Sequence, residues 1–133
     1  MRKVWPALLI TLAVVPATVA AQDATQAGAA RVMVEAGVGT AVADRQLTGS
    51  AESFPVSAGT LYCYMKISNA ADTQIEHVWY KGEAEMARVK LNVGGSPWRT
   101  WSSKKVTEDA AGDWRCDIVQ DGAVLKSVKF KIE

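Results

Sequence analysis

Hydrophobic and polar residues alternate along most of the chain, which is the pattern of half-buried β-strands. Outside the first 21 residues, no window of 11 residues carries the period of an amphipathic helix. Turn-forming residues separate the alternating runs at intervals of roughly 8–12 residues, as in sandwiches of short antiparallel strands. The clearest runs cover residues 32–38, 61–67, 74–81, 87–93, 114–118 and 128–132. The sequence therefore predicts an all-β fold, a small antiparallel β-sandwich with an immunoglobulin-like architecture over residues 31–133.

Local turn chemistry refines this prediction. Asp121-Gly122 is the strongest hairpin signal, because both residues tolerate the positive φ angles of a type I′ turn. The alternation loses its phase at residues 124–126, which indicates a β-bulge. Residues 44–59 are rich in Gly, Ser, Asp and Pro, so they predict a connection with room for a short edge strand. Residues 107–113 predict a polar turn with room for one helical turn.

The N-terminal 21 residues have the layout of a secretory signal peptide. Arg2 and Lys3 are followed by an apolar run at residues 7–15, and small residues favour cleavage after Ala21. The alternative is an uncleaved membrane anchor, but the run is shorter than the ~20 residues that span a bilayer. Residues 22–30 are polar and small, which predicts a flexible tail. We therefore expect a periplasmic or secreted protein that keeps no membrane span after cleavage.

The chain has two cysteines, Cys63 and Cys116, and the expected export determines their oxidation state. An oxidising compartment favours a disulfide between them, and the alternative is a pair of buried free thiols. With His77, the single histidine, they fall short of a closed four-ligand zinc set, so no metal is expected. Trp79 after the first cysteine, and Trp114 two residues before the second, follow the order found in immunoglobulin-type domains.

Composition excludes several functional classes. A chain of 133 residues with 49% hydrophobic and 22% charged residues is the size of one globular domain. Removing Arg2 and Lys3 with the leader leaves 13 of the 15 basic residues against 14 acidic ones, a net charge near −1. This balance argues against a nucleic-acid binder, and the length argues against a multidomain enzyme. No cofactor is implied.

A cluster of aromatic and basic residues offers the best candidates for ligand binding. The candidates are His77, Trp79, Trp98, Arg99, Trp101 and Lys104. On one regular strand, Trp98 and Trp101 point to opposite faces, so we expect one in the core and the other at the surface. An exposed indole beside Arg99 provides a flat surface for a peptide or a sugar ring. The alternative is that both rings cover the ends of the sandwich.

Catalysis receives little support. His77 is a lone histidine whose neighbour Glu76 points to the opposite face, and the chain has no Gly-x-Ser-x-Gly motif. Glu83 and Glu85 share a face beside a turn, where solvated surface carboxylates are expected. We therefore expect no enzyme, and a small hydrolase that uses His77 is the least favoured hypothesis.

Two kinds of binding protein remain. We expect a non-catalytic domain that binds a protein or peptide in the bacterial envelope through an edge strand and the Trp98–Trp101 region. The alternative is a carbohydrate-binding module for cell-wall or surface glycans, for which Tyr62, Tyr64 and Tyr80 are further aromatic candidates.

A series of motifs from about Phe54 to the C-terminus resembles a known family. In chain order these motifs are LYCYMKI, HVWY, RVKLNV, WRTWSSK, GDWRCDIV, DGAVL and KFKI. They are similar to those of the bacterial domain of unknown function 2914 family. The resemblance implies an exported or membrane-tethered protein with a β-rich domain at its C-terminal end, and it implies no activity.

Overall fold

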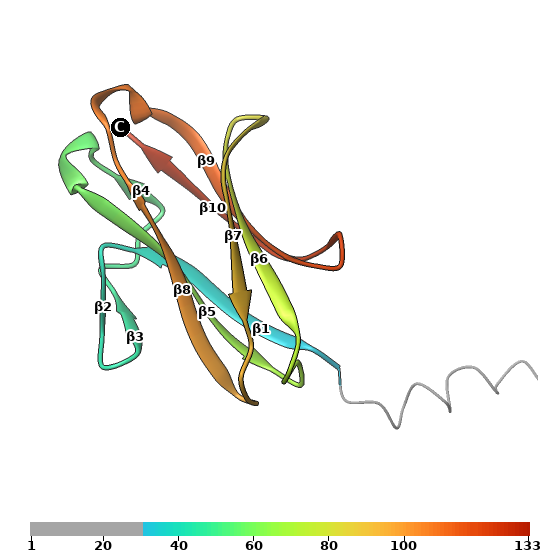
Figure 1. Ribbon diagram of the computed structural model, residues 1–133. Helices are drawn as coiled ribbons and strands as arrows, with labels where there is room; N and C mark the ends of the chain where they lie inside the picture. Colours follow the sequence, from blue (N-terminus) through green and yellow to red (C-terminus); the bar gives the residue numbers. More distant parts are fainter. Residues whose placement is uncertain (1–30) are drawn as a thin grey trace, which may run out of the picture. The chain divides into compact units, whose positions relative to one another are not determined.

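The computed structural model describes residues 31–133, which form two β-sheets and a small hairpin (Figure 1). The predicted signal peptide at residues 1–21 and the predicted tail at residues 22–30 lie outside the described residues. Within residues 31–133, no helix is long and apolar enough to span a membrane. The predicted all-β fold is confirmed.

The smaller sheet has three strands in the order β1-β5-β8. The strands are β1 (Met33–Gly39), β5 (Thr60–Ser68) and β8 (Trp98–Lys105). Both pairings are antiparallel, and β5 lies in the centre. Buried and partly exposed residues alternate without interruption along β5, as the sequence pattern predicts for a central strand with one face in the core.

The larger sheet has five strands in the order β4-β10-β9-β6-β7. The strands are β4 (Ser53–Phe54), β6 (Gln74–Lys81), β7 (Ala84–Asn92), β9 (Gly112–Gln120) and β10 (Ala123–Ile132). The β9–β10 turn has Asp121 at φ 49° and Gly122 at φ 79°, which confirms the predicted hairpin. The register shifts between Val124 and Lys126, where a bulge is predicted.

Two features of the region before β5 differ from the expected connection. β2 (Ala41–Ala43) and β3 (Gln46–Thr48) form a hairpin, and β4 pairs with β10 in parallel, so the sheets are not purely antiparallel. The only helical segments in residues 31–133 are the 3₁₀ turns η1 (Val56–Ala58) and η2 (Glu108–Ala110). The second coincides with the polar turn that the sequence predicts.

The core lies between the two sheets. One cluster joins Leu61 and Cys63 of β5 to Trp79, Trp114 and further buried residues of the larger sheet. A disulfide links Cys63 of β5 to Cys116 of β9, with the two Cα atoms 6.6 Å apart. The predicted pairing is therefore present, and it connects the central strand of each sheet. Buried Trp79 and Trp114 belong to the same core cluster as the two sulfurs.

Candidate functional site

The outward face of the smaller sheet carries a pair of aromatic rings. Tyr64 of β5 and Trp101 of β8 are opposite each other in the strand register. Their ring centroids are 6.3 Å apart and their planes differ by 16°. Trp101 is 37% exposed, a large value for so large an apolar side chain, whereas Tyr64 is half-buried. The pair thus presents one exposed indole to solvent, stacked beside the tyrosine ring.

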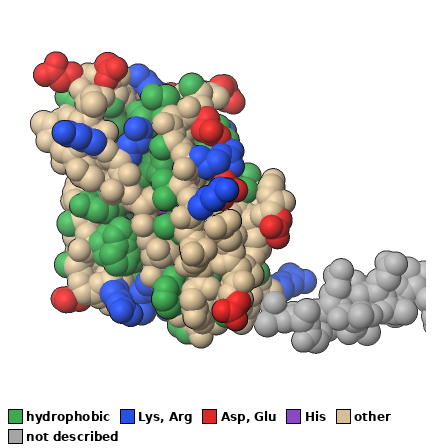
Figure 2. Space-filling model, in the orientation of Figure 1, with side chains coloured by type: hydrophobic (Ala, Val, Ile, Leu, Met, Phe, Trp, Pro, Cys, Tyr) green, Lys and Arg blue, Asp and Glu red, His purple; other side chains and the backbone are tan. Residues whose placement is uncertain are grey.

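Arginine and lysine side chains surround this aromatic pair. Arg99, two positions before Trp101, lies on the same face of β8 and is opposite Lys66 of β5. The Tyr64 hydroxyl donates a hydrogen bond of 2.7 Å to the Arg45 carbonyl oxygen, which ties the turn of the β2–β3 hairpin to this face. Figure 2 shows hydrophobic and basic side chains next to each other at the lower left, where Figure 1 places the hairpin and β8. We call Arg45, Tyr64, Lys66, Arg99 and Trp101 the outer aromatic-basic face.

Two hollows flank Arg99 on this surface. One, of about 200 Å³, is lined by Arg45, Pro97, Trp98, Arg99 and Trp101. The other, of about 290 Å³, lies over Glu35, Gln46, Leu47, Tyr64, Lys66 and Arg99. Because Arg99 contributes to both hollows, its side chain separates two places where groups of a ligand can sit.

Trp98 does not occupy the core, contrary to the expectation that one of the two β8 indoles would. Trp98 is 37% exposed, the same as Trp101. It is the first residue of β8, and its ring lies against Gly94, where an added Cβ would be 2.9 Å from the indole. The ring therefore packs on the preceding loop at the end of the sheet, and both indoles border the hollow beside Arg99.

His77 and Trp79, two of the predicted candidates, are fully enclosed. Their exposed fractions are 0% and 1%. Ser102 of β8 joins them, because its Oγ accepts a hydrogen bond of 3.1 Å from Trp79 Nε1 and lies 2.8 Å from His77 Nδ1. These contacts connect β6 to β8 across the core.

Burial sets the chemistry of His77. Desolvation lowers its pKa from 6.5 to about 4, so the imidazole is neutral at pH 7. Its Nε2 atom has no hydrogen-bond partner among residues 31–133. A serine–histidine pair also serves nucleophilic catalysis, but that chemistry requires an accessible hydroxyl, and Ser102 is only 5% exposed. The arrangement is suited to joining the sheets.

One group of potential metal ligands lies in the described residues. The ligand atoms of Cys63, His77 and Cys116 are all within 4.8 Å of one another. Metals bind cysteine as a free thiolate, whereas both sulfurs here are bonded to each other. In this disulfide-bonded state, the two sulfurs cannot act as thiolate ligands, and the three side chains pack as part of the core.

Lys104 is separated from the other basic candidates by the direction of its side chain. Its Nζ atom lies 5.9 Å from the ring centroid of Trp114, on the inward side of β8. Arg99 and Trp101 differ from Lys104 by odd numbers of positions, so they point outward. Of the predicted candidates, the structure thus brings together Trp98, Arg99 and Trp101.

Sequence reasoning missed a larger hollow on the five-stranded sheet. It has a volume of about 570 Å³ and lies over Trp114 and Phe130. Its charged lining contains three acidic and three basic residues, Glu52, Glu83, Asp113, Arg115, Lys129 and Lys131. Because the two signs are balanced and Lys131 already pairs with Asp113 at 3.9 Å, this hollow has little electrostatic preference for a ligand.

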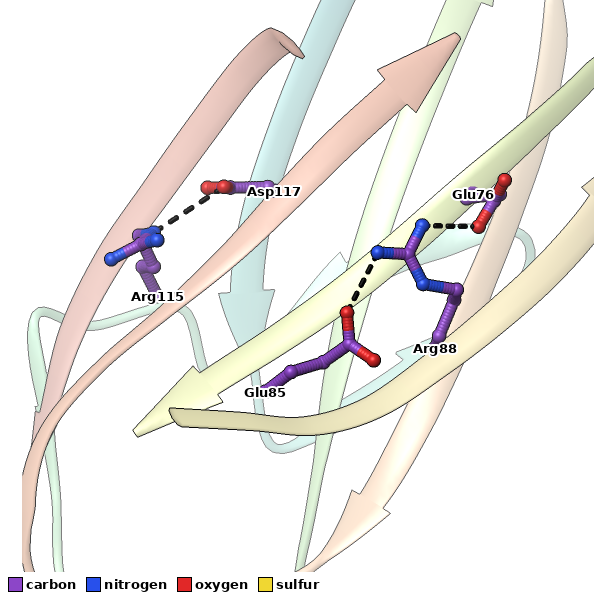
Figure 3. A network of polar contacts seen from close by, with 5 residues as sticks. All are labelled: Glu76, Glu85, Arg88, Arg115 and Asp117. Atoms are coloured by element: carbon purple, nitrogen blue, oxygen red, sulfur yellow. Dashed lines mark hydrogen bonds and ion pairs between the residues drawn. The ribbon is translucent and has the colours of Figure 1, made fainter. Parts of the chain in front are cut away.

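The arginines of the larger sheet are paired with carboxylates (Figure 3). Arg88 lies between Glu76 and Glu85, with N–O distances of 2.6 and 2.7 Å. These two acceptors raise the pKa of Arg88 above its ordinary value. Arg115 contacts Asp117 at 3.3 Å and stacks on the Tyr80 ring with its Cζ atom 4.1 Å from the centroid. Both of these arginines are therefore neutralised by carboxylates of the same sheet.

The fold and this surface define a two-layer β domain with an inter-sheet disulfide and an aromatic-basic face on an edge strand. A family model described as "Protein of unknown function (DUF2914)" matches residues 72–132, which confirms the predicted resemblance over that part of the chain. The match contains β6 to β10 and so includes Trp98, Arg99 and Trp101, whereas Arg45, Tyr64 and Lys66 precede it. No curated protein matches the chain.

Proposed function

We propose that the chain is an exported, non-catalytic domain that binds an extended peptide segment of a partner protein in the bacterial envelope. The segment would lie along β8, with its side chains on the outer aromatic-basic face. The observation that carries the proposal is the exposed Trp101, stacked beside the half-buried Tyr64, on a strand that, within residues 31–133, pairs only with β5.

The free edge of β8 supports a peptide in this position. An edge strand offers unpaired backbone groups, and an added strand satisfies them while its alternate side chains face one surface of the sheet. Large aromatic side chains beside such an edge supply apolar contact area at low entropic cost. Export is supported by the leader pattern in the sequence and by the disulfide, which persists in oxidising compartments.

Selection from a random peptide library displayed on phage tests this function. We expect the wild-type domain to enrich peptides that Trp101→Ala binds at least tenfold more weakly, because the substitution removes half of the aromatic surface. Met86→Ala is the matched control, since it removes an exposed apolar side chain from β7, the edge of the other sheet. Circular dichroism and a thiol assay verify that each variant is folded and oxidised.

If a selected peptide pairs with β8 through its backbone, the amide groups on one of its edges must be free to donate hydrogen bonds. N-methylation of alternate amides removes donors on one edge of an extended peptide, so one of the two possible methylation patterns should abolish binding. The proposal is wrong if no peptide is enriched, or if the enriched peptides bind Trp101→Ala as well as they bind the wild type.

A glycan is the second candidate ligand, and the two exposed indoles of β8, Trp98 and Trp101, favour it. An exposed indole offers a flat face on which a sugar ring stacks. Titration with neutral cell-wall oligosaccharides, followed by tryptophan fluorescence, distinguishes the two. Binding of such a sugar at micromolar concentration, with loss in Trp101→Ala, would favour the glycan over the peptide.

A further inference from the structure

The hollow between Arg45 and Arg99 has an unusual composition. Two of its five lining residues are arginines, two are tryptophans, and none is acidic. Guanidinium groups bind carboxylates through paired hydrogen bonds, and the neighbouring indoles limit access of water to such a contact. The lining therefore has the chemistry of a site for an anionic group.

The basic groups at this hollow have no carboxylate partner in the described part of the chain. Neither Arg45, Lys66 nor Arg99 has a carboxylate oxygen within 4.0 Å, whereas on the larger sheet Arg88 has two carboxylate partners and Arg115 has one. Figure 3 shows Arg88 between two glutamates and Arg115 beside Asp117. The nearest candidate on the smaller sheet is Glu35, which is opposite Lys66 in the strand register and lines only the neighbouring hollow.

The strand register gives Arg99 a basic neighbour on β5, Lys66, while Glu35 of β1 is opposite that same lysine. Lys66 and Arg99 are direct cross-strand neighbours, and like charges in this position destabilise a sheet. A bound anion would remove the repulsion between them. The hollow lined by Arg45 and Arg99 would then accommodate an outward side chain of a peptide that runs along β8.

We infer that the hollow lined by Arg45 and Arg99 binds a carboxylate side chain, so that the partner segment is an acidic peptide. This inference rests on the proposed function and adds the chemistry of its ligand. The carboxylate accepts hydrogen bonds from the guanidinium groups of Arg45 and Arg99, and an adjacent apolar side chain of the peptide packs on Trp101.

A matched pair of synthetic peptides tests the inference. One probe is the acetylated heptapeptide Thr-Glu-Val-Glu-Tyr-Glu-Val with an amidated C-terminus, and the other has Gln at each Glu position. We expect the glutamate peptide to bind at least tenfold more tightly, and its binding to weaken as salt is added. Isothermal titration at two salt concentrations measures both effects.

Arginine variants locate the site. Arg99→Gln and Arg45→Gln should each weaken the glutamate peptide about tenfold or more and leave the glutamine peptide nearly unchanged. Arg88→Gln is the matched control, because Arg88 is also an exposed arginine but already has two carboxylate partners. Equal binding of the two peptides, or equal loss in Arg88→Gln, would overturn the inference.

Titration with other anions shows whether the site prefers a peptide carboxylate to an acidic glycan, a phosphate or a lipid headgroup. Polygalacturonate, inorganic phosphate and vesicles containing anionic phospholipid are titrated in parallel, and tighter binding of any of these than of the glutamate peptide would overturn the assignment to a peptide. If both peptides bind equally and depend on Trp101, the proposed function stands and the inference fails. If neither peptide binds and the phage selection also yields none, both fail.

Discussion

Tyr64 and Trp101 meet because β5 and β8 pair in a register that places these two residues opposite each other. The same register puts Lys66 next to Arg99, and Cys63 next to Ser102 on the inward side. Each outward residue thus has an inward counterpart one position away. A shift of one residue between the strands would bury the aromatic pair and expose the core, so the disulfide and the outer face depend on the same pairing.

The inward residues predict a specific dependence of stability on pH. His77 has a pKa of about 4 in the folded state against 6.5 in an unfolded chain, so only the unfolded chain takes up the proton between these values. Folding stability from this residue is fully present above pH 6.5, decreases as the pH falls, and is lost by pH 4. The loss amounts to about 3 kcal/mol.

Urea denaturation at several pH values between 4 and 7 measures this dependence. His77→Gln removes the titrating group, and we expect its free energy of unfolding to change less over this range than that of the wild type. The difference between the two curves isolates His77 from the surface carboxylates, which titrate in both proteins. Parallel curves would contradict the account of a neutral, desolvated imidazole.

For single residues, the sequence predicted which side chains belong to the candidate site better than it predicted which residues they contact. The two-residue period of a strand separates Trp98 from Trp101, but Trp98, at the start of β8, packs on the preceding loop and not in the core as expected. Arg99 and Arg45 line the same hollow although they are 54 positions apart in the sequence. His77 contacts Ser102, which is 25 positions away. No local pattern specifies such pairs, because they depend on the order of strands and on the register between them.

The β2–β3 hairpin is the element that completes the outer face. Leu47 of β3 packs over Gly37 and Gly39 of β1, where a Cβ would come within 3.0 and 2.9 Å of the leucine side chain. A Cβ at Gly39 would also be 2.5 Å from the Thr48 carbonyl oxygen. Glycine at this position therefore allows the hairpin backbone to approach the sheet and to hold Arg45 beside the hollow.

Gly39→Ala tests the role of this hairpin. Because the added methyl group meets backbone, we expect the hairpin to move outward and the protein to lose about 1–3 kcal/mol of stability. The glutamate peptide should bind about as weakly to this variant as to Arg45→Gln. Gly95→Ala is the control, since its Cβ would meet Trp98 at an ordinary contact distance of 3.5 Å.

Titration calorimetry and thermal unfolding give the two readouts. Unchanged peptide affinity in a destabilised Gly39→Ala protein would show that Arg45 acts without support from the hairpin. The sequence predicted a connection with room for one short edge strand, and β4 is such a strand. The β2–β3 hairpin was not predicted, because strands of three residues are too short to display alternation. The parallel pairing of β4 with β10 was missed for the same reason, since β4 has two residues.

At the scale of the whole molecule, the disulfide joins the two sheets at their centres. It closes a separation of 53 residues, and the chain-entropy model assigns about 4 kcal/mol of stabilisation to such a link. The prediction of this pairing required only the even cysteine count and an exported chain. The sequence pattern predicted a sandwich of short strands with this disulfide, and it did not predict the order of the strands within the two sheets.

Replacing both cysteines by alanine should lower the free energy of unfolding by about 4 kcal/mol, measured by urea denaturation. The peptide affinity of the fraction that remains folded should stay within about twofold, because Cys63 and Cys116 lie in the core and not on the outer face. An unchanged stability would contradict the placement of the disulfide as the main covalent link between the sheets.

The distribution of charge distinguishes the two sides of the molecule. Acids neutralise the arginines of the larger sheet, and the three basic residues of the outer aromatic-basic face lack such partners within residues 31–133. The central claim is that this face receives the ligand.

Amide chemical-shift mapping by NMR during titration with the glutamate peptide tests the claim most directly. We predict that the largest shifts fall in β8, in residues 64–66 of β5 and at the turn of the β2–β3 hairpin. Large shifts in residues 113–115 and 129–131, around the hollow over Trp114, with β8 unchanged, would contradict it.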